Sequence, residues 1–229
     1  MEEREKSIYE DTNNNLEKNI TWSYKGYFLG FMLSVFQVMT GIASYVTQTG
    51  HVIAVTLKEP IFGIYTPPII TIAQLIGTFI SIPLLQYLEW KSLILIGGFS
   101  IALLNGLIGM FIYFFGAYVD FAPYAMTLAV VCIMALLFTF GITVGSCAWP
   151  YASYMMPSNA IVAAQVLNWI LAGLSIIAFS VNTNATSNPL VMLWIYSGTT
   201  FVLSVVCWIL MINIKGLSII EVQKKLATD

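Results

Sequence analysis

Apolar residues are concentrated in six long runs, which short polar connectors separate. Each run reaches or exceeds the ~20 residues that an α-helix needs to cross a hydrocarbon core of ~30 Å. The runs are continuous and lack two-residue alternation, which argues against a transmembrane β-barrel. They are Tyr27–Val46, Ile61–Tyr87, Leu93–Gly116, Ala125–Trp149, Ile161–Val181 and Leu190–Ile212. The pattern therefore predicts an all-α, polytopic membrane protein with six transmembrane helices.

Charged residues avoid these runs. They make up 9% of the chain, against roughly 25% in soluble domains. A charge at the centre of a bilayer costs at least ~2.5–3.5 kcal/mol, so this distribution supports the membrane assignment. We expect three parts: a polar, acidic N-terminal tail (1–24), a six-helix transmembrane domain (25–214) and a polar C-terminal tail (215–229). Between Tyr27 and Ile212 the charged residues are Lys58, Glu59, Glu89, Lys91 and Asp120, each of which lies between two runs.

The distribution of basic residues predicts the orientation of the chain. Six spans place both termini on one side of the membrane. Eight Lys and Arg residues lie near the two termini, up to Lys25 and from Lys215, and in the connector 88–92, whereas Lys58 alone lies on the other side. Because basic residues favour the cytoplasmic side, we expect both termini to face the cytosol, or the matrix in a mitochondrial membrane. An organelle inner membrane is expected for a subunit of a complex, and the plasma membrane for a transporter.

Sequence signatures of catalysis and of metal binding are absent. The chain contains no CxxC, HExxH, Walker or GxSxG motif, and its single histidine, His51, lies in a connector. The three cysteines fall within apolar runs and are interpreted as small buried hydrophobic residues. A net charge of −2 gives no indication of a nucleic-acid partner. We therefore predict that the protein is not an enzyme and has no catalytic residue, metal or cofactor, and that the lipid bilayer surrounds it.

Five short patterns occur in order along the chain. Residues Gln37–Ala43 read QVMTGIA, and Gln74 precedes Lys91 by 17 positions. Residues Gly145–Trp149 read GSCAW and are followed eight positions later by Pro157, then by the pair Asn168-Trp169, and Ile212–Glu221 reads INIKGLSIIE. Together they resemble the C-terminal six-helix half of a sugar porter of the major facilitator superfamily. There the corresponding segments are QQx[ST]GIN, an Asn before a GRR turn, GPxPW, an Asn-Trp pair and PETKGx[ST]xEE.

The departures from the family pattern are as informative as the matches. Val38 and Ala43 replace two sugar-facing polar residues, and Tyr154 stands where the family has a glutamate. The GRR turn survives only as Lys91, and both prolines of the GPxPW hinge are missing. The cytosolic ion pairs that the family uses for gating are therefore lost, which weighs against ordinary gating.

The resemblance implies a substrate near the bilayer midplane, between two six-helix halves. One half supplies one wall, on which the family pattern places Gln37, Gln74, Trp149, Asn168 and Trp169. Each has an alternative role. The three carboxamides can instead bond neighbouring helices, and the tryptophans can anchor the chain at the membrane interface.

A polar wall facing hydrocarbon lacks hydrogen-bond partners, so we expect a second copy, a partner half or other membrane-protein subunits to cover it. The first hypothesis is a structural or accessory subunit of a larger membrane complex, with little or no transport on its own. The second is a facilitative transporter of a hexose-like solute, working as a dimer or with a partner half. Transport would be facilitative because no Asp, Glu or His lies inside a run to relay protons. A third is a truncated product without function.

Overall fold

The computed structural model describes residues 22–57, 60–117, 122–186 and 190–228. Most of the predicted N-terminal tail lies outside these ranges, as does Lys58, on which the orientation partly depends. Every regular element within the described ranges is a helix, in agreement with the predicted all-α class. The helices are α2 (Tyr24–Met39), α3 (Ile42–Leu57), α4 (Pro60–Tyr87), α5 (Trp90–Ala117), α6 (Ala122–Ile142), α7 (Val144–Met155), α8 (Ser158–Thr186), α9 (Leu190–Leu210) and α10 (Ile219–Thr228).

The predicted six spans are confirmed. The described residues contain six helical stretches long and apolar enough to cross a membrane. Two of them consist of consecutive helices, α2 with α3 and α6 with α7, whereas α4, α5, α8 and α9 each form one span. The stretches are Tyr24–Gly50, Ile64–Tyr87, Trp90–Phe114, Thr127–Met155, Ser158–Thr183 and Leu190–Leu210.

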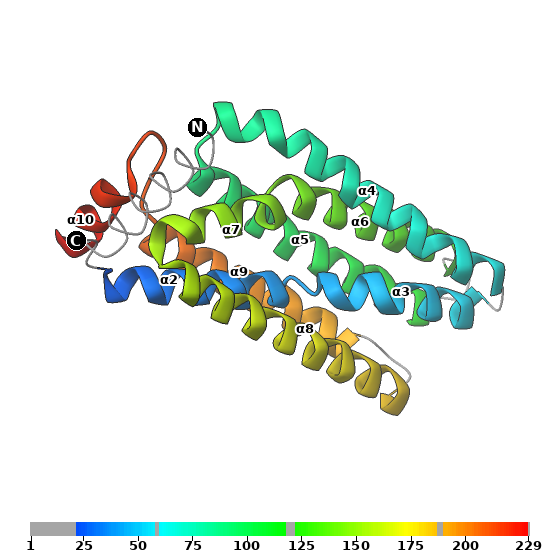
Figure 1. The fold of residues 1–229 in the computed structure, drawn as a ribbon. Coiled ribbons are helices and arrows are strands. Elements are labelled where there is room, and N and C mark those ends of the chain that lie inside the picture. The colour runs from blue at the N-terminus through cyan, green and yellow to red at the C-terminus, as the bar shows by residue number, and fades with distance from the viewer. Residues whose placement is uncertain (1–21, 58–59, 118–121, 187–189, 229) are drawn as a thin grey trace, which may run out of the picture.

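The six spans run alongside one another in a bundle (Figure 1). α5 packs against α6 and α9, and α4 packs against α6 and α3. The first span is central, with 67% of its apolar window buried, whereas the α4 and α8 spans are flanks with 17% buried. The core between them includes Phe36, Leu136 and Tyr151, which have no exposed surface. The outer faces of α4 and α8 are therefore the ones that most need a covering of lipid or protein.

α4 and α6 cross at two glycines. A Cβ atom on Gly77 would lie 2.4 Å from the carbonyl oxygen of Phe138, and one on Gly141 would lie 2.4 Å from the carbonyl oxygen of Gln74. Only residues without a side chain allow the two backbones to come this close, as in other small-residue contacts between membrane helices. The crossing fixes the backbone of Gln74 against α6.

The first and fourth apolar runs were each predicted as one helix, and the structure corrects this. The first is interrupted at Thr40 and Gly41, where Gly41 has a φ of +77°, a conformation that residues with a Cβ rarely adopt. The fourth is interrupted at Thr143, with φ −116° and ψ −97°. Both interruptions fall inside apolar sequence, where hydropathy alone gives no signal for them.

Side chains from neighbouring helices satisfy the carbonyl groups at the first interruption. Thr200 Oγ1 on α9 donates to Met39 O at 2.8 Å, and Asn105 Nδ2 on α5 donates to Thr40 O at 3.2 Å. Tyr45 OH in turn donates to Asn105 Oδ1. A broken helix is stable in a bilayer only when protein groups replace the lost backbone bonds, and these residues meet that requirement.

The C-terminal segment 215–229, expected to be a polar tail, contains the helix α10. Ser218 and Glu221 form a capping box at its start, in which Ser218 N and Ser218 Oγ each donate to Glu221 Oε2 at 2.8 Å. Val222 and Leu226 are buried on one face of the helix. The sequence signal for this docking is the amphipathic spacing of those two residues.

Gln223 fastens α10 to two other helices. Its Nε2 donates to Tyr154 O at 2.8 Å and to Met155 O at 3.2 Å, at the end of α7. Its Oε1 accepts from Ser23 N at 3.0 Å, at the start of α2. The beginning and the end of the described chain therefore meet at one end of the bundle (Figure 1).

Candidate functional site

A groove of about 430 Å³ lies beside the interruption of the first span. Residues of α2, α3, α4, α6 and α8 line it. Most of its lining is apolar. Val38 and Ala43 both line it; they are two of the positions where the sequence departs from the sugar-porter pattern, and neither brings a polar side chain to this groove.

Four of the five predicted site residues come together here: Gln37, Gln74, Asn168 and Trp169 all line the groove. The fifth does not. Trp149 lies on α7 more than one turn beyond the interruption at Thr143, and it packs instead against a small cluster that contains Ala152, Met156 and Ala164. Trp149 therefore does not line this groove, and its predicted role in a site stays a prediction.

Gln37 joins three helices. Its side chain is only 7% exposed. Its Nε2 donates to Val144 O at 3.3 Å, at the first residue of α7, and its Oε1 accepts from Asn168 Nδ2 at 3.4 Å. The carboxamide thus connects the end of α2 to the interruption of the fourth span and to α8, and both of its ends are used within the bundle.

Asn168 belongs to a reciprocal contact between α2 and α8. Its Nδ2 also donates to Ser34 O at 2.8 Å, while Ser34 Oγ donates to Ala164 O at 2.7 Å. In the structure Gln37 and Asn168 therefore form hydrogen bonds between helices. The expectation that these carboxamides need an external cover to find partners is corrected for Gln37, whose two ends are both bonded.

Gln74 and Trp169 differ from this pair. Among the described residues no side-chain hydrogen bond involves the Gln74 carboxamide; its backbone oxygen accepts from Thr78 Oγ1. Trp169 is 77% exposed. Both side chains line the groove, so a molecule that fills or covers it would contact them.

Comparison with known proteins gives one result. The chain matches the family model described as "Sugar (and other) transporter" over residues 1–226. It belongs to this sugar transporter family. The match and the six candidate spans fit one half of a sugar porter, and the family is one of transporters rather than enzymes. A search of curated proteins finds no match.

This member of the sugar transporter family also has a buried polar cluster behind the groove that sequence reasoning missed. The hydroxyl of Tyr196 lies 2.8 Å from both Ser44 Oγ and Ser175 Oγ. Together with Asn105 and Thr200, these groups tie α3, α5, α8 and α9 together around the interruption at Gly41. A lone Asn inside an apolar run is expensive in a membrane, and that is the signal by which Asn105 could have been found.

Proposed function

We propose that the chain is a sugar-porter-derived half-transporter that acts mainly as a structural or accessory subunit of a larger membrane complex, with little or no transport on its own. The observation that carries the proposal is the state of Gln37. Its donor and its acceptor are both engaged inside the bundle, at the position where the resemblance to sugar porters implies sugar contact.

The hydrogen-bonding capacity of the groove is small. A sugar that leaves water needs a partner for each hydroxyl that it buries, because an unpaired buried polar group costs ~1–3 kcal/mol. Val38 and Ala43 offer no side-chain hydrogen bond, and Gln37 already uses one N–H and one lone pair of its carboxamide within the bundle. Gln74 is the carboxamide of this wall with the most capacity left, whereas Gln37 and Asn168 are bonded between helices, and this use of two of the three carboxamides supports a structural rather than a sugar-binding surface.

The surface around the groove supports a protein partner. Gln74 at a face that otherwise meets hydrocarbon would lack partners, and α4 and α8 on either side expose large apolar side chains such as Phe79 and Leu174. A second copy, or other membrane-protein subunits, would cover the groove, with lipid around the rest. In this role the protein belongs in an organelle inner membrane such as the mitochondrial one, with both termini in the matrix or cytosol.

Extraction in mild detergent followed by native mass measurement tests this proposal. We expect the chain to migrate with heavier membrane-protein companions, and Gln74→Leu to weaken that assembly, because the partner groups that pair with the carboxamide are then left unsatisfied. A discrete monomer or small homo-oligomer without companions would contradict the accessory role.

A second candidate function is facilitative transport of a hexose-like solute as a dimer or with a partner half, in the plasma membrane. It is favoured by the clustering of Gln37, Gln74, Asn168 and Trp169 at one groove. The two interrupted spans beside that groove favour it as well, because discontinuous helices are typical of transporter binding sites. The geometry of the groove favours transport, whereas the chemistry of its lining favours the accessory role.

Reconstituted liposomes separate the two functions. The accessory role predicts no flux of labelled hexose above that of empty vesicles. Transport predicts saturable flux that Gln37→Ala and Gln74→Ala both impair. Gln74→Ala is the sharper variant, because no hydrogen bond within the described bundle depends on the Gln74 side chain. Gln86→Ala, an exposed carboxamide on the same helix outside the groove, is the matched control.

A further inference from the structure

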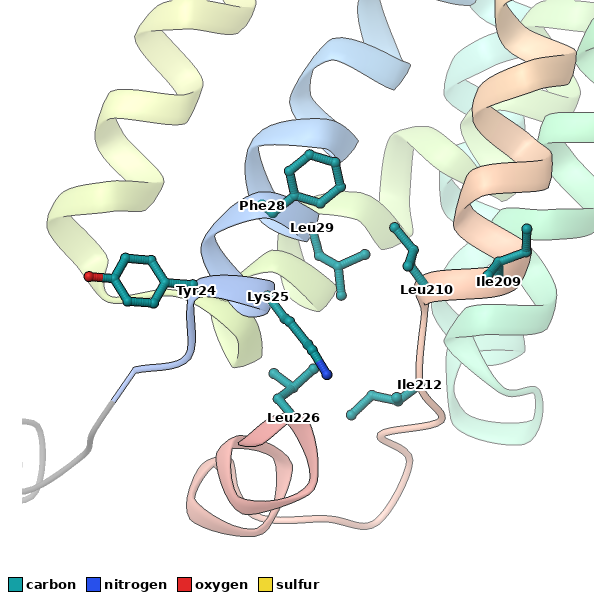
Figure 2. Close-up of a pocket in the computed structure, with 8 residues that line it drawn as sticks. All are labelled: Tyr24, Lys25, Phe28, Leu29, Ile209, Leu210, Ile212 and Leu226. Atoms are coloured by element: carbon teal, nitrogen blue, oxygen red, sulfur yellow. The ribbon is translucent and has the colours of Figure 1, made fainter. Parts of the chain in front are cut away.

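A second groove, of about 520 Å³, lies at the end of the bundle where the described chain begins and ends. It is bounded by the first turns of α2, the end of α9 and the last turns of α10 (Figure 2). Its volume falls within the ~300–1,000 Å³ of ordinary ligand sites. The wall is formed by the apolar side chains Phe28, Leu29, Ile209, Leu210, Ile212 and Leu226.

Lys25 is the charged residue of this groove. Figure 2 shows its side chain reaching from α2 toward Leu226 and Ile212, while the ring of Tyr24 points away from the groove. Lys25 is exposed. None of the residues that line the groove is acidic, and no hydrogen bond or ion pair within the described part of the chain engages Lys25. The groove thus combines a long apolar wall with one uncompensated positive charge.

The groove lies at the ends of two candidate membrane spans, where lipid head groups are expected. The first span begins at Tyr24 and the last ends at Leu210, so both of the walls that these spans form end at the membrane boundary. α10 lies across the same end, with Leu226 buried and the neighbouring Lys224 and Lys225 exposed. Aromatic and basic residues gather at such boundaries, where anionic head groups attract basic side chains.

We propose that this groove binds an anionic phospholipid from the leaflet on the side of the two termini. One acyl chain lies along the apolar wall of α2 and α9, and Lys25 Nζ binds the phosphate. The charge decides between lipids: a zwitterionic lipid offers the same acyl chain, but its own cation competes with Lys25 for the phosphate. The proposal is independent of whether the chain transports a solute.

Lipid binding to the full chain in mild detergent tests this site. The protein is titrated with phosphatidylglycerol and, separately, with phosphatidylcholine of identical acyl chains, and bound lipid is counted by native mass spectrometry. We expect phosphatidylglycerol to bind about fivefold more tightly, the ratio that one basic residue near a membrane surface gives. Lys25→Gln should remove this preference and Lys25→Arg should keep it. Lys91→Gln, at the same end of the bundle but outside the groove, should leave it unchanged.

Two further arms distinguish the lipid from other occupants. Leu210→Trp fills the groove without changing its charge and should weaken binding of phosphatidylglycerol. Soluble glycerol phosphate should not compete, because it lacks the acyl chain. Equal binding of the two lipids, an equal loss in Lys91→Gln and Lys25→Gln, or competition by glycerol phosphate would overturn the proposal. So would a preference that emerges only after removal of residues 1–20, since the acidic N-terminal segment would then be the occupant.

Discussion

Asn168 and Gln37 are joined through Asn168 Nδ2 and Gln37 Oε1 at 3.4 Å, and this bond continues through Gln37 Nε2 to the backbone of Val144. The pair links α8 to the end of α2 and to the start of α7. Two side chains that the sugar-porter pattern assigns to substrate thus hold together the wall on which they lie. A wall braced in this way resists local rearrangement around the two interrupted spans.

Removing Asn168 should destabilise the bundle. Asn168→Leu leaves Ser34 O and Gln37 Oε1 without this donor, and we expect a loss of about 1–2 kcal/mol, as for polar contacts between membrane helices and for unpaired buried groups. Equilibrium unfolding of the purified protein in mild detergent measures it. Gln165→Leu, an exposed position on the same helix, is the control and should change stability little. A double-mutant cycle with Gln37→Leu should give a coupling of at least ~0.5 kcal/mol; additive losses would mean that the pair does not interact.

The crossing of α4 and α6 should not tolerate a methyl group. Gly77→Ala or Gly141→Ala would bring Cβ to 2.4 Å from a backbone oxygen, and two backbones cannot give way as a flexible side chain can. We expect each variant to lose about 1–3 kcal/mol, as overpacked cores do. Gly198→Ala, with no atom within 4 Å of the added Cβ, should match the wild type or exceed it slightly. The midpoint of thermal unfolding decides, and three equal values would refute the close crossing.

Gly41 should be needed for two separable reasons. Its φ is +77°, and an added Cβ would lie 2.6 Å from the ring of Tyr196, whereas Gly216 has a φ of +78° with no atom within 4 Å. Gly216→Ala should therefore lose only the backbone term of about 1–2 kcal/mol. Gly41→Ala should lose more, because overpacking against Tyr196 is added. The two variants are compared by denaturant unfolding. A larger loss in Gly216→Ala would contradict this account of the interruption.

The helix α10 should become less stable in acid. The backbone N–H and the side chain of Ser218 hold the pKa of the Glu221 carboxyl below its ordinary value of 4.5. Because the folded helix binds the proton less readily than the unfolded segment, this stabilisation is present above pH 4.5 and disappears as the pH falls through the lowered pKa. Hydrogen exchange of the C-terminal peptide should show wild type better protected than Glu221→Gln at neutral pH. The difference should vanish in acid; a difference that persists there would exclude this carboxylate as the cause.

The resemblance to sugar porters allowed four residues of the groove to be predicted, whereas contacts between residues far apart in the chain could not be predicted. Gln37, Gln74, Asn168 and Trp169 were placed on one wall from motif order, and the structure brings them to one groove. Trp149, which lies on α7 beyond the interruption at Thr143, does not line that groove. Asn105, Thr200 and Gln223 were missed because their partners lie far away in the chain, and periodicity reports only neighbours along one helix.

The sequence by itself determined that this is a membrane bundle and how many times it crosses. A bilayer requires about 20 apolar residues per span and excludes charge from its centre, and both requirements can be read along the chain. The tertiary structure decided where the first and fourth spans break and whether a polar side chain faces the groove or a neighbour. Pro67, Pro68 and Pro83 stay within α4, whereas Thr40 and Thr143 mark breaks. A backbone inside a membrane can leave the helix only where protein groups replace its hydrogen bonds, and in this bundle several of those groups come from other helices.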